Sequence, residues 1–215
     1  LDHQAQLGEK QAKLAQLANP SLLDTWLLSY WAVTLEKVYR SLSQFKPDTA
    51  SLALQEFVTT WSNWYIRLSR QRVWTNSDNN ADKQALYATL HRVLSDFCVA
   101  LSPFLPFYSE ELNSHISSTF ESVHLKNWPE MSKEWRNTQL NADMEKLKTL
   151  AELGHSVRKE QGIKVRQALA GITYTLPSDQ AFALPKNEAE YKRLLSSELN
   201  IKNIILEYDQ KTIQA

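Results

Sequence analysis

Glycine is scarce in this chain of 215 residues and occurs only at Gly8, Gly154, Gly162 and Gly171. Tight turns and phosphate-binding loops need glycine, because it adopts backbone conformations that other residues avoid. The scarcity excludes a G-x-G-x-x-G or P-loop motif. The long interval between Gly8 and Gly154 also favours long helices.

Cysteine is scarcer still, with Cys98 as the single example. A lone cysteine excludes an internal disulfide and a cysteine-rich zinc site, and it indicates a reducing compartment, which we take to be the cytoplasm. No apolar run approaches the roughly 20 residues that span a bilayer, so we expect no membrane partner. The chain starts at Leu1 without a methionine, so we expect it to be a piece of a longer polypeptide.

An excess of charge of one sign is also missing, because 24 basic and 24 acidic side chains cancel. Any nucleic-acid site must therefore be a local basic patch. Aromatic residues, in contrast, are plentiful, with seven Trp, eight Tyr and seven Phe. That number exceeds what a minimal helical core needs, so some aromatic surface is left for a ligand.

Apolar residues recur at three- and four-residue steps in five segments, which predicts amphipathic helices. The first segment follows a start signal at Pro20-Ser21, and Pro47-Asp48 separates it from the second. The prolines Pro103 and Pro106 end the third. The expected helices cover about residues 23–45, 54–74, 86–104, 109–116 and 137–161.

The pattern changes after Gly162. Residues 164–169 and 172–176 are expected to be extended, 188–199 helical, and 201–208 a strand. The predicted fold class is mainly α, a helical bundle with a small C-terminal α+β appendage. The expected division is a polar helical or flexible lead-in at 1–19, a bundle at 20–162 and the appendage at 163–215.

The most informative segment is Phe57–Ser77, which contains no acidic residue and carries three positive charges. At about 100° per residue, its polar and apolar residues fall on opposite sides of a helix. Arg72 turns toward the apolar side unless the helix has already ended. The predicted exposed face carries Asn63, Arg67, Arg70 and Trp74.

Two arginines and an indole on one exposed face suit unpaired RNA bases. A guanidinium pairs with phosphate through a planar fork, and an exposed indole offers a stacking surface for bases. The alternative is that Arg67 and Arg70 form a solvated face while Trp74 packs on a neighbouring element.

A second basic cluster surrounds Gly162, where helix gives way to the appendage. A loop at this point could contact phosphates. The alternative is that basic side chains near a helix C-terminus stabilise the helix dipole. The cluster consists of Arg158, Lys159, Lys164 and Arg166, opposed only by Glu160.

Enzyme motifs are not evident. Glu110 and Glu111 are adjacent on a helix and point about 100° apart, so they cannot converge on one substrate. Ser156 follows His155 but lacks a G-x-S-x-G turn. The histidines are too dispersed for a helical metal motif. We assign no catalytic residue and no metal ligand; the histidines are His3, His91, His115, His124 and His155.

Residues 63–74 closely resemble the N-W-Y-I-R-x-S-R-x-R-x-W signature of isoleucyl-tRNA synthetases, which are class I aminoacyl-tRNA synthetases. Residues 23–29 resemble the family's L-D-R-W-I-L-S, with Thr25 in place of Arg. Residues 101–107 resemble L-x-P-F-x-P-F. Two further segments agree in order, 123–129 with V-H-L-x-x-W-P and 163–169 with I-K-V-R-Q-P-L, the latter with Ala168 in place of Pro.

The resemblance covers about residues 20–170 and implies an anticodon-binding region. The intact family enzyme ligates isoleucine to its tRNA using ATP, on a catalytic domain bearing H-I-G-H and K-M-S-K-S. Neither motif occurs here, and Glu130–Glu134 resembles the second only superficially. This chain is thus expected to be part of an enzyme, without its catalytic domain and without a cofactor of its own.

The partners that the resemblance implies are the tRNA for isoleucine and the remaining domains of the same synthetase, with the chain as a monomer. Two alternatives stay open: the same region of a valyl- or leucyl-tRNA synthetase, and a helical protein-interaction scaffold that does not bind RNA. The predicted tRNA-binding residues are Asn63, Arg67, Arg70, Arg72, Trp74, Arg158, Lys164 and Arg166.

Overall fold

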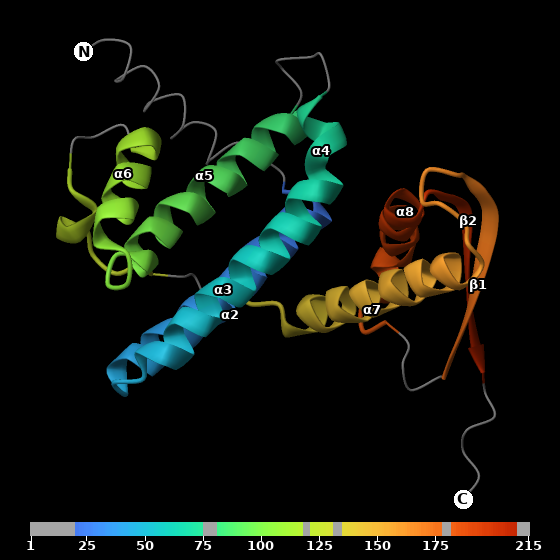
Figure 1. Cartoon of the computed structure of the whole chain (residues 1–215), viewed down its shortest axis with the longest axis horizontal. Helices are drawn as coiled ribbons and strands as arrows, with labels where there is room; N and C mark the ends of the chain where they lie inside the picture. The colour runs from blue at the N-terminus through green and yellow to red at the C-terminus, as the bar shows by residue number, and fades with distance from the viewer. Residues whose placement is uncertain (1–19, 75–80, 118–120, 131–134, 178–181, 210–215) are drawn as a thin grey trace, which may run out of the picture. The chain divides into compact units, whose positions relative to one another are not determined.

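The computed structural model describes residues 20–74, 81–117, 121–130, 135–177 and 182–209. Contacts divide the chain into two compact units, Leu1–Arg136 and Asn137–Ala215. Among the described residues, the regular elements of the first unit are all helices, and the second unit combines helices with a two-stranded sheet (Figure 1). The predicted fold class, mainly α with a small α+β part, is confirmed.

The helices of the first unit start where the sequence supplies start signals. Ser21 caps the first helix, because its hydroxyl accepts from the Asp24 N–H at 3.2 Å while the Asp24 carboxylate accepts from the Ser21 N–H at 2.9 Å. Pro47 and Pro106 occupy first-turn positions of two others. The elements are α2 (Leu22–Ser43), α3 (Pro47–Thr60), η1 (Trp61–Ile66), α4 (Arg67–Val73), α5 (Ala81–Leu101), α6 (Pro106–Ile116) and η2 (Val123–Leu125).

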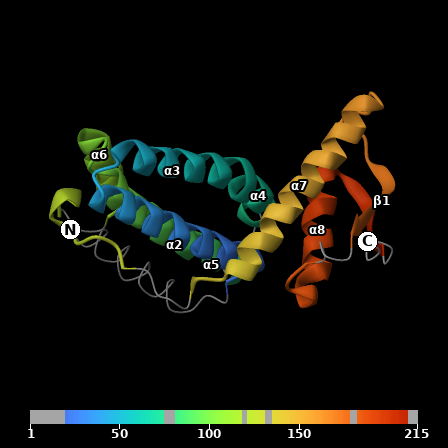
Figure 2. The ribbon, with the colours of Figure 1, turned by 90° about the horizontal axis from the view of Figure 1, so that it is seen from below.

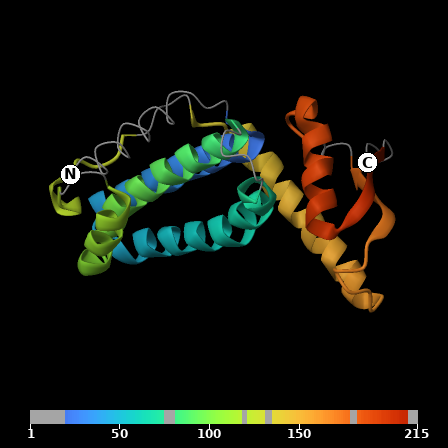
Figure 3. The ribbon, with the colours of Figure 1, turned by 90° about the horizontal axis from the view of Figure 1, so that it is seen from above.

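An aromatic cluster fills the interior of this unit. The rings of Trp31 and Phe57 have centroids 4.6 Å apart, and those of Trp31 and Phe97 lie 6.0 Å apart. These side chains come from α2, α3 and α5, so the cluster joins the three long helices. α2 contacts both α3 and α5, and Figures 2 and 3 show α6 and α4 at opposite ends of this unit.

The second predicted helix is not one regular α-helix, because the π-helical segment η1 lies between α3 and α4. The wider π turn shifts the direction in which the following side chains point. Trp64 and Tyr65 are consequently both buried. In a regular α-helix adjacent residues point about 100° apart, so an inward Tyr65 would leave Trp64 off the buried side.

The second unit packs two helices with a short parallel sheet. Leu169 pairs with Ile201 and Tyr174 with Leu206 in the sheet register. Asn137 caps the first helix by accepting from the Leu140 N–H at 2.9 Å. The elements are α7 (Thr138–Glu160), β1 (Leu169–Pro177), η5 (Pro185–Asn187), α8 (Glu188–Leu199) and β2 (Ile201–Asp209).

One expectation about the tail is wrong. Residues 164–168 are not extended; they form a turn in which the Gln167 N–H donates to the Lys164 carbonyl at 3.0 Å, and β1 starts only at Leu169. The expected stop at Gly162 is confirmed, because α7 ends at Glu160 and Gly162 has a positive φ of 65°. The first compact unit ends at Arg136, before α7, whereas the predicted boundary lay at residue 162, after this helix.

Among the described helices, none combines the length and the apolar composition that a membrane span requires.

Candidate RNA-binding surface

The outward side of α4 and the end of η1 carry the basic and aromatic residues singled out by the sequence. We call this surface the α4 face. Trp74 is the C-cap of α4, and 75 % of its surface is exposed. This exposure contradicts the alternative interpretation, in which Trp74 packs on a neighbouring element. The α4 face consists of Asn63, Arg67, Arg70 and Trp74, all of them exposed.

Arg72 lies on the same short helix but points inward. Its Nη1 and Nη2 donate to the two carboxylate oxygens of Asp24, at 2.8 and 2.7 Å. Its Nε donates to Asp82 at 2.9 Å, and only 11 % of the side chain is exposed. Since both edges of the fork are taken by carboxylates, the prediction that Arg72 contacts tRNA directly does not fit this geometry.

Asp24 is fully buried at the start of α2 and stays charged. Burial alone would raise the pKa of its carboxyl, but the hydrogen bonds from Arg72 and Tyr65 outweigh it and hold the pKa below the usual value. The Tyr65 hydroxyl donates to Asp24 at 2.6 Å. Burial, and then the Asp24 charge, raise the pKa of Tyr65 well above its usual range, so it remains a donor.

The stability of the first unit is expected to fall in acid as Asp24 takes up a proton. Because its folded pKa is lowered, the stabilisation is complete above the unfolded pKa of about 3.9 and is lost as the pH falls through the folded pKa. Urea denaturation of the parent and of Asp24→Asn, at neutral pH and at about pH 3, measures this linkage. The difference in free energy of unfolding between the two proteins should shrink in acid, and a constant or growing difference would contradict the assignment.

The second predicted cluster is divided by the structure. Lys164 and Arg166 are exposed in the turn that follows α7. Arg158 is only 3 % exposed, and its guanidinium donates to main-chain carbonyls that precede each of the two strands. The prediction that Arg158 contacts tRNA is therefore not supported by its position. The acceptors are the carbonyls of Lys164 (3.1 Å), Gln167 (3.1 Å), Leu199 (2.7 Å) and Asn200 (3.2 Å).

Asn200 holds the same turn from the other side. It ends α8 in the left-handed conformation, with φ 52° and ψ 51°, which Asn adopts more readily than most residues. Its side-chain amide donates to the carbonyls of Val165 and Arg166, both at 3.1 Å. Arg158 and Asn200 thus bind the carbonyls of the turn, while the side chains of Lys164 and Arg166 face solvent. We call residues 164–167 the basic turn.

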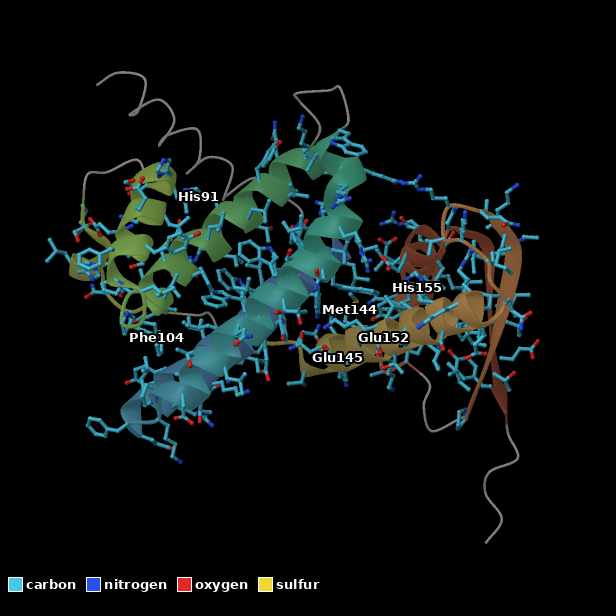
Figure 4. The ribbon with its side chains drawn as sticks, in the orientation of Figure 1. His91, Phe104, Met144, Glu145, Glu152 and His155 are labelled. Carbon is cyan, nitrogen blue, oxygen red and sulfur yellow. The ribbon has the colours of Figure 1, made fainter. Side chains whose placement is uncertain are left out.

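The remaining histidines and acids do not assemble a reaction centre in the described part of the chain. No group of three or more His, Cys, Asp or Glu suited to a metal ion occurs among the described residues. His155, labelled in Figure 4, pairs its Nε2 with the buried Glu198 at 3.0 Å, joining α7 to α8. Glu110 accepts from the Val123 N–H at 2.8 Å and so orders a loop. His3 lies outside the described residues.

Sequence reasoning did not identify the buried partners of this surface. Asp24 follows the predicted helix start at Pro20-Ser21 and Tyr65 lies in the second predicted helix, and their contact spans 41 positions in the sequence. A signal was available for Asp24, because an acid that follows Ser21 by three residues is typical of a capping box. No local signal connects Arg158 with Asn200, since helical periodicity does not reveal which carbonyls a buried arginine meets.

Comparison with known proteins agrees with this architecture. Residues 24–173 match the family described as the anticodon-binding domain of tRNA ligase. The chain belongs to this family of tRNA-ligase anticodon-binding domains. The match includes the α4 face and the basic turn.

Similar curated proteins include isoleucine–tRNA ligases, in agreement with the motif resemblance. The chain is 37 % identical over 187 residues to the protein of Chlamydia abortus, which covers 86 % of this chain and 17 % of that protein. It is 34 % identical over 193 residues to that of Bacillus thuringiensis, covering 87 % and 18 %. For Clostridium tetani the values are 31 % over 194 residues, covering 88 % and 18 %. The chain thus spans less than a fifth of the length of these relatives.

Proposed function

We propose that this chain is the part of an isoleucine–tRNA ligase that binds the anticodon stem-loop of the tRNA for isoleucine. The observation that carries the proposal is the exposed Trp74 ring beside Arg70 at the end of a helix that contains no acid. An indole stacks on an unpaired base and a guanidinium pairs with the adjoining phosphate, so the α4 face suits a single-stranded loop. Lys164 and Arg166 supply a second phosphate contact.

The catalytic steps belong, in this proposal, to other parts of the longer enzyme. Activation of isoleucine with ATP needs a nucleotide site, and neither the H-I-G-H nor the K-M-S-K-S motif occurs in this chain. The chain's own contribution is to hold the tRNA. We further propose that it acts in the cytoplasm, as a monomeric part of the synthetase.

Arg67→Ala/Arg70→Ala is expected to weaken binding of an isoleucine anticodon stem-loop by about tenfold, because two phosphate or base contacts are removed. The slope of log K against log salt should also become shallower by about one. Fluorescence anisotropy of a labelled stem-loop, titrated at several salt concentrations, measures both quantities. Unchanged affinity together with an unchanged slope would remove these residues from the interface.

A matched control is Lys37→Ala/Arg40→Ala, which deletes the same positive charge from exposed positions near the end of α2. This variant is expected to keep most of its affinity, since α4 contacts the opposite end of α2 through Asp24. A stem-loop with a different anticodon serves as the second control. Equal binding of both RNAs, with no dependence on salt, would favour the scaffold alternative.

The scaffold alternative has one observation in its favour. A cavity of about 640 Å³ lies between α3, α5 and α6, with a mostly apolar lining that includes Leu54, Val58 and Phe97. Leu105 and Tyr108 also line it and are more than half exposed. Such a cavity suits an apolar partner. It involves none of the α4-face residues, so the two functions can be tested separately.

A further inference from the structure

The ends of three helices meet at the Arg72 side chain. Asp24 lies in the first turn of α2, Arg72 in the last turn of α4, and Asp82 in the first turn of α5. Arg72 Nη2 is 2.7 Å from a carboxylate oxygen of each acid and also donates to the Asp82 carbonyl at 3.0 Å. A single guanidinium therefore fixes the end of α4 to two other helices. We call Asp24, Tyr65, Arg72 and Asp82 the junction.

The junction holds the chain on both sides of Arg67 and Arg70. Tyr65 precedes α4 in η1 and donates to Asp24, while Arg72 follows Arg70 and binds the same carboxylate. Arg67 and Arg70 lie between these two attachment points in the sequence. The segment that presents them is thus tied twice to a carboxylate that is itself fixed by the Ser21 N–H and hydroxyl, both at 2.9 Å.

Such fixing matters because α4 has only seven residues and follows an irregular π turn. α4 is the last stretch of a continuous helical run formed by α3, η1 and α4, and helix ends fray. Within the described residues, the Trp74 N–H donates to the Arg70 carbonyl at 3.3 Å and so keeps Trp74 in its cap position. The contacts of Arg72 with Asp24 and Asp82 are therefore placed to hold this last turn, which ends in the exposed indole.

We propose that Arg72 is a positioning residue for RNA binding: the junction holds Arg70 and Trp74 in the arrangement that the anticodon loop meets, and Arg72 itself does not touch RNA. This inference rests on the proposed function of the α4 face. Its physical basis is preorganisation, because side chains already ordered in the free protein lose less entropy on binding. The carboxylates of Asp24 and Asp82 also neutralise the Arg72 charge.

Asp82→Asn distinguishes direct RNA contact by Arg72 from positioning, because the two roles predict opposite changes in affinity for the stem-loop. The Asp82 side chain is 47 % exposed, so replacing it removes a negative charge near the RNA and releases one edge of the guanidinium. A direct Arg72 contact would then bind the stem-loop more tightly and with a steeper salt dependence. Positioning predicts the opposite, a loss of about three- to tenfold in affinity.

Tyr65→Phe is the second variant, because it removes the hydroxyl that donates to Asp24 without changing any charge at neutral pH. Its affinity is also expected to fall, by about threefold. Glu56→Gln, an exposed α3 carboxylate paired with Lys37, is the charge-matched control for Asp82→Asn and should bind like the parent. All proteins are compared well below their melting temperatures, with circular dichroism confirming that each is folded.

The outcomes distinguish this inference from the proposed function. If Arg67→Ala/Arg70→Ala binds the stem-loop as tightly as the parent, the proposed function fails. If that variant is weakened while Asp82→Asn and Tyr65→Phe bind as well as the parent or better, the function stands and the positioning role is overturned. Weakened binding by both junction variants, with the Glu56→Gln control unchanged, supports positioning.

Discussion

Asp24→Asn is expected to lower the free energy of unfolding by about 3 kcal/mol, the low end of the range for removing one partner of a buried ion pair. The amide removes one of the two carboxylates that contact the Arg72 guanidinium among the described residues, and it is the more deeply buried of the two. It also replaces the acceptor of the Tyr65 hydroxyl and one half of the α2 capping box. Urea denaturation followed by far-UV circular dichroism measures the change at neutral pH.

Two further variants make this prediction specific. Asp48→Asn alters an exposed acid in the first turn of α3 and should change stability by no more than about 0.5 kcal/mol. Arg72→Met removes the opposite partner and should destabilise by a similar amount to Asp24→Asn. The double variant should lose clearly less than the sum of the single losses, because both remove one interaction. Additive losses would show that the pair is not coupled.

Gly154→Val is expected to destabilise the second unit by about 2–3 kcal/mol through overpacking. A Cβ at Gly154 would lie 2.6 Å from the Tyr174 hydroxyl oxygen and 2.7 Å from a Leu199 methyl carbon. Both neighbours are buried, and the Tyr174 hydroxyl is held by the Leu150 carbonyl at 2.8 Å. Neither can move aside without disturbing the packing of α7 against α8 and β1.

The control for this variant lies on the same helix. Glu152, labelled in Figure 4, is on the exposed side of α7, so Glu152→Val introduces the same branched side chain without a clash. Its expected effect is the loss of helix propensity, about 0.5 kcal/mol. Thermal unfolding of both variants tests the difference. Equal losses at the two positions would mean that close packing is not the reason for glycine at 154.

The helices of the first unit could be predicted from sequence because their signals are local. Apolar spacing and the starts at Ser21 and Pro47 depend on residues within a turn or two of each other. The π segment η1 could not be predicted in this way. It allows Trp64 and Tyr65 to be buried together, and that advantage exists only when α2 and α5 are present.

The binding surface was predictable in part for the same reason. The exposure of Arg67, Arg70 and Trp74 follows from helical periodicity, and the structure confirms it. The inward positions of Arg72 and Arg158 depend on partners distant in sequence: Arg72 binds Asp24, 48 positions away, and Arg158 binds the Leu199 carbonyl, 41 positions away. Spacing shows which side of a helix a residue takes and leaves its distant partner unknown.

The buried guanidinium of Arg158 has a mechanical consequence for the basic turn. Its acceptors immediately precede β1 on one side and β2 on the other, so both strands begin at the same side chain. The backbone of Lys164 and Arg166 therefore cannot move away from the strands without breaking these hydrogen bonds. A ligand that displaces the backbone of this turn must therefore also disturb the first residues of both strands, whereas the exposed side chains of Lys164 and Arg166 can still adjust.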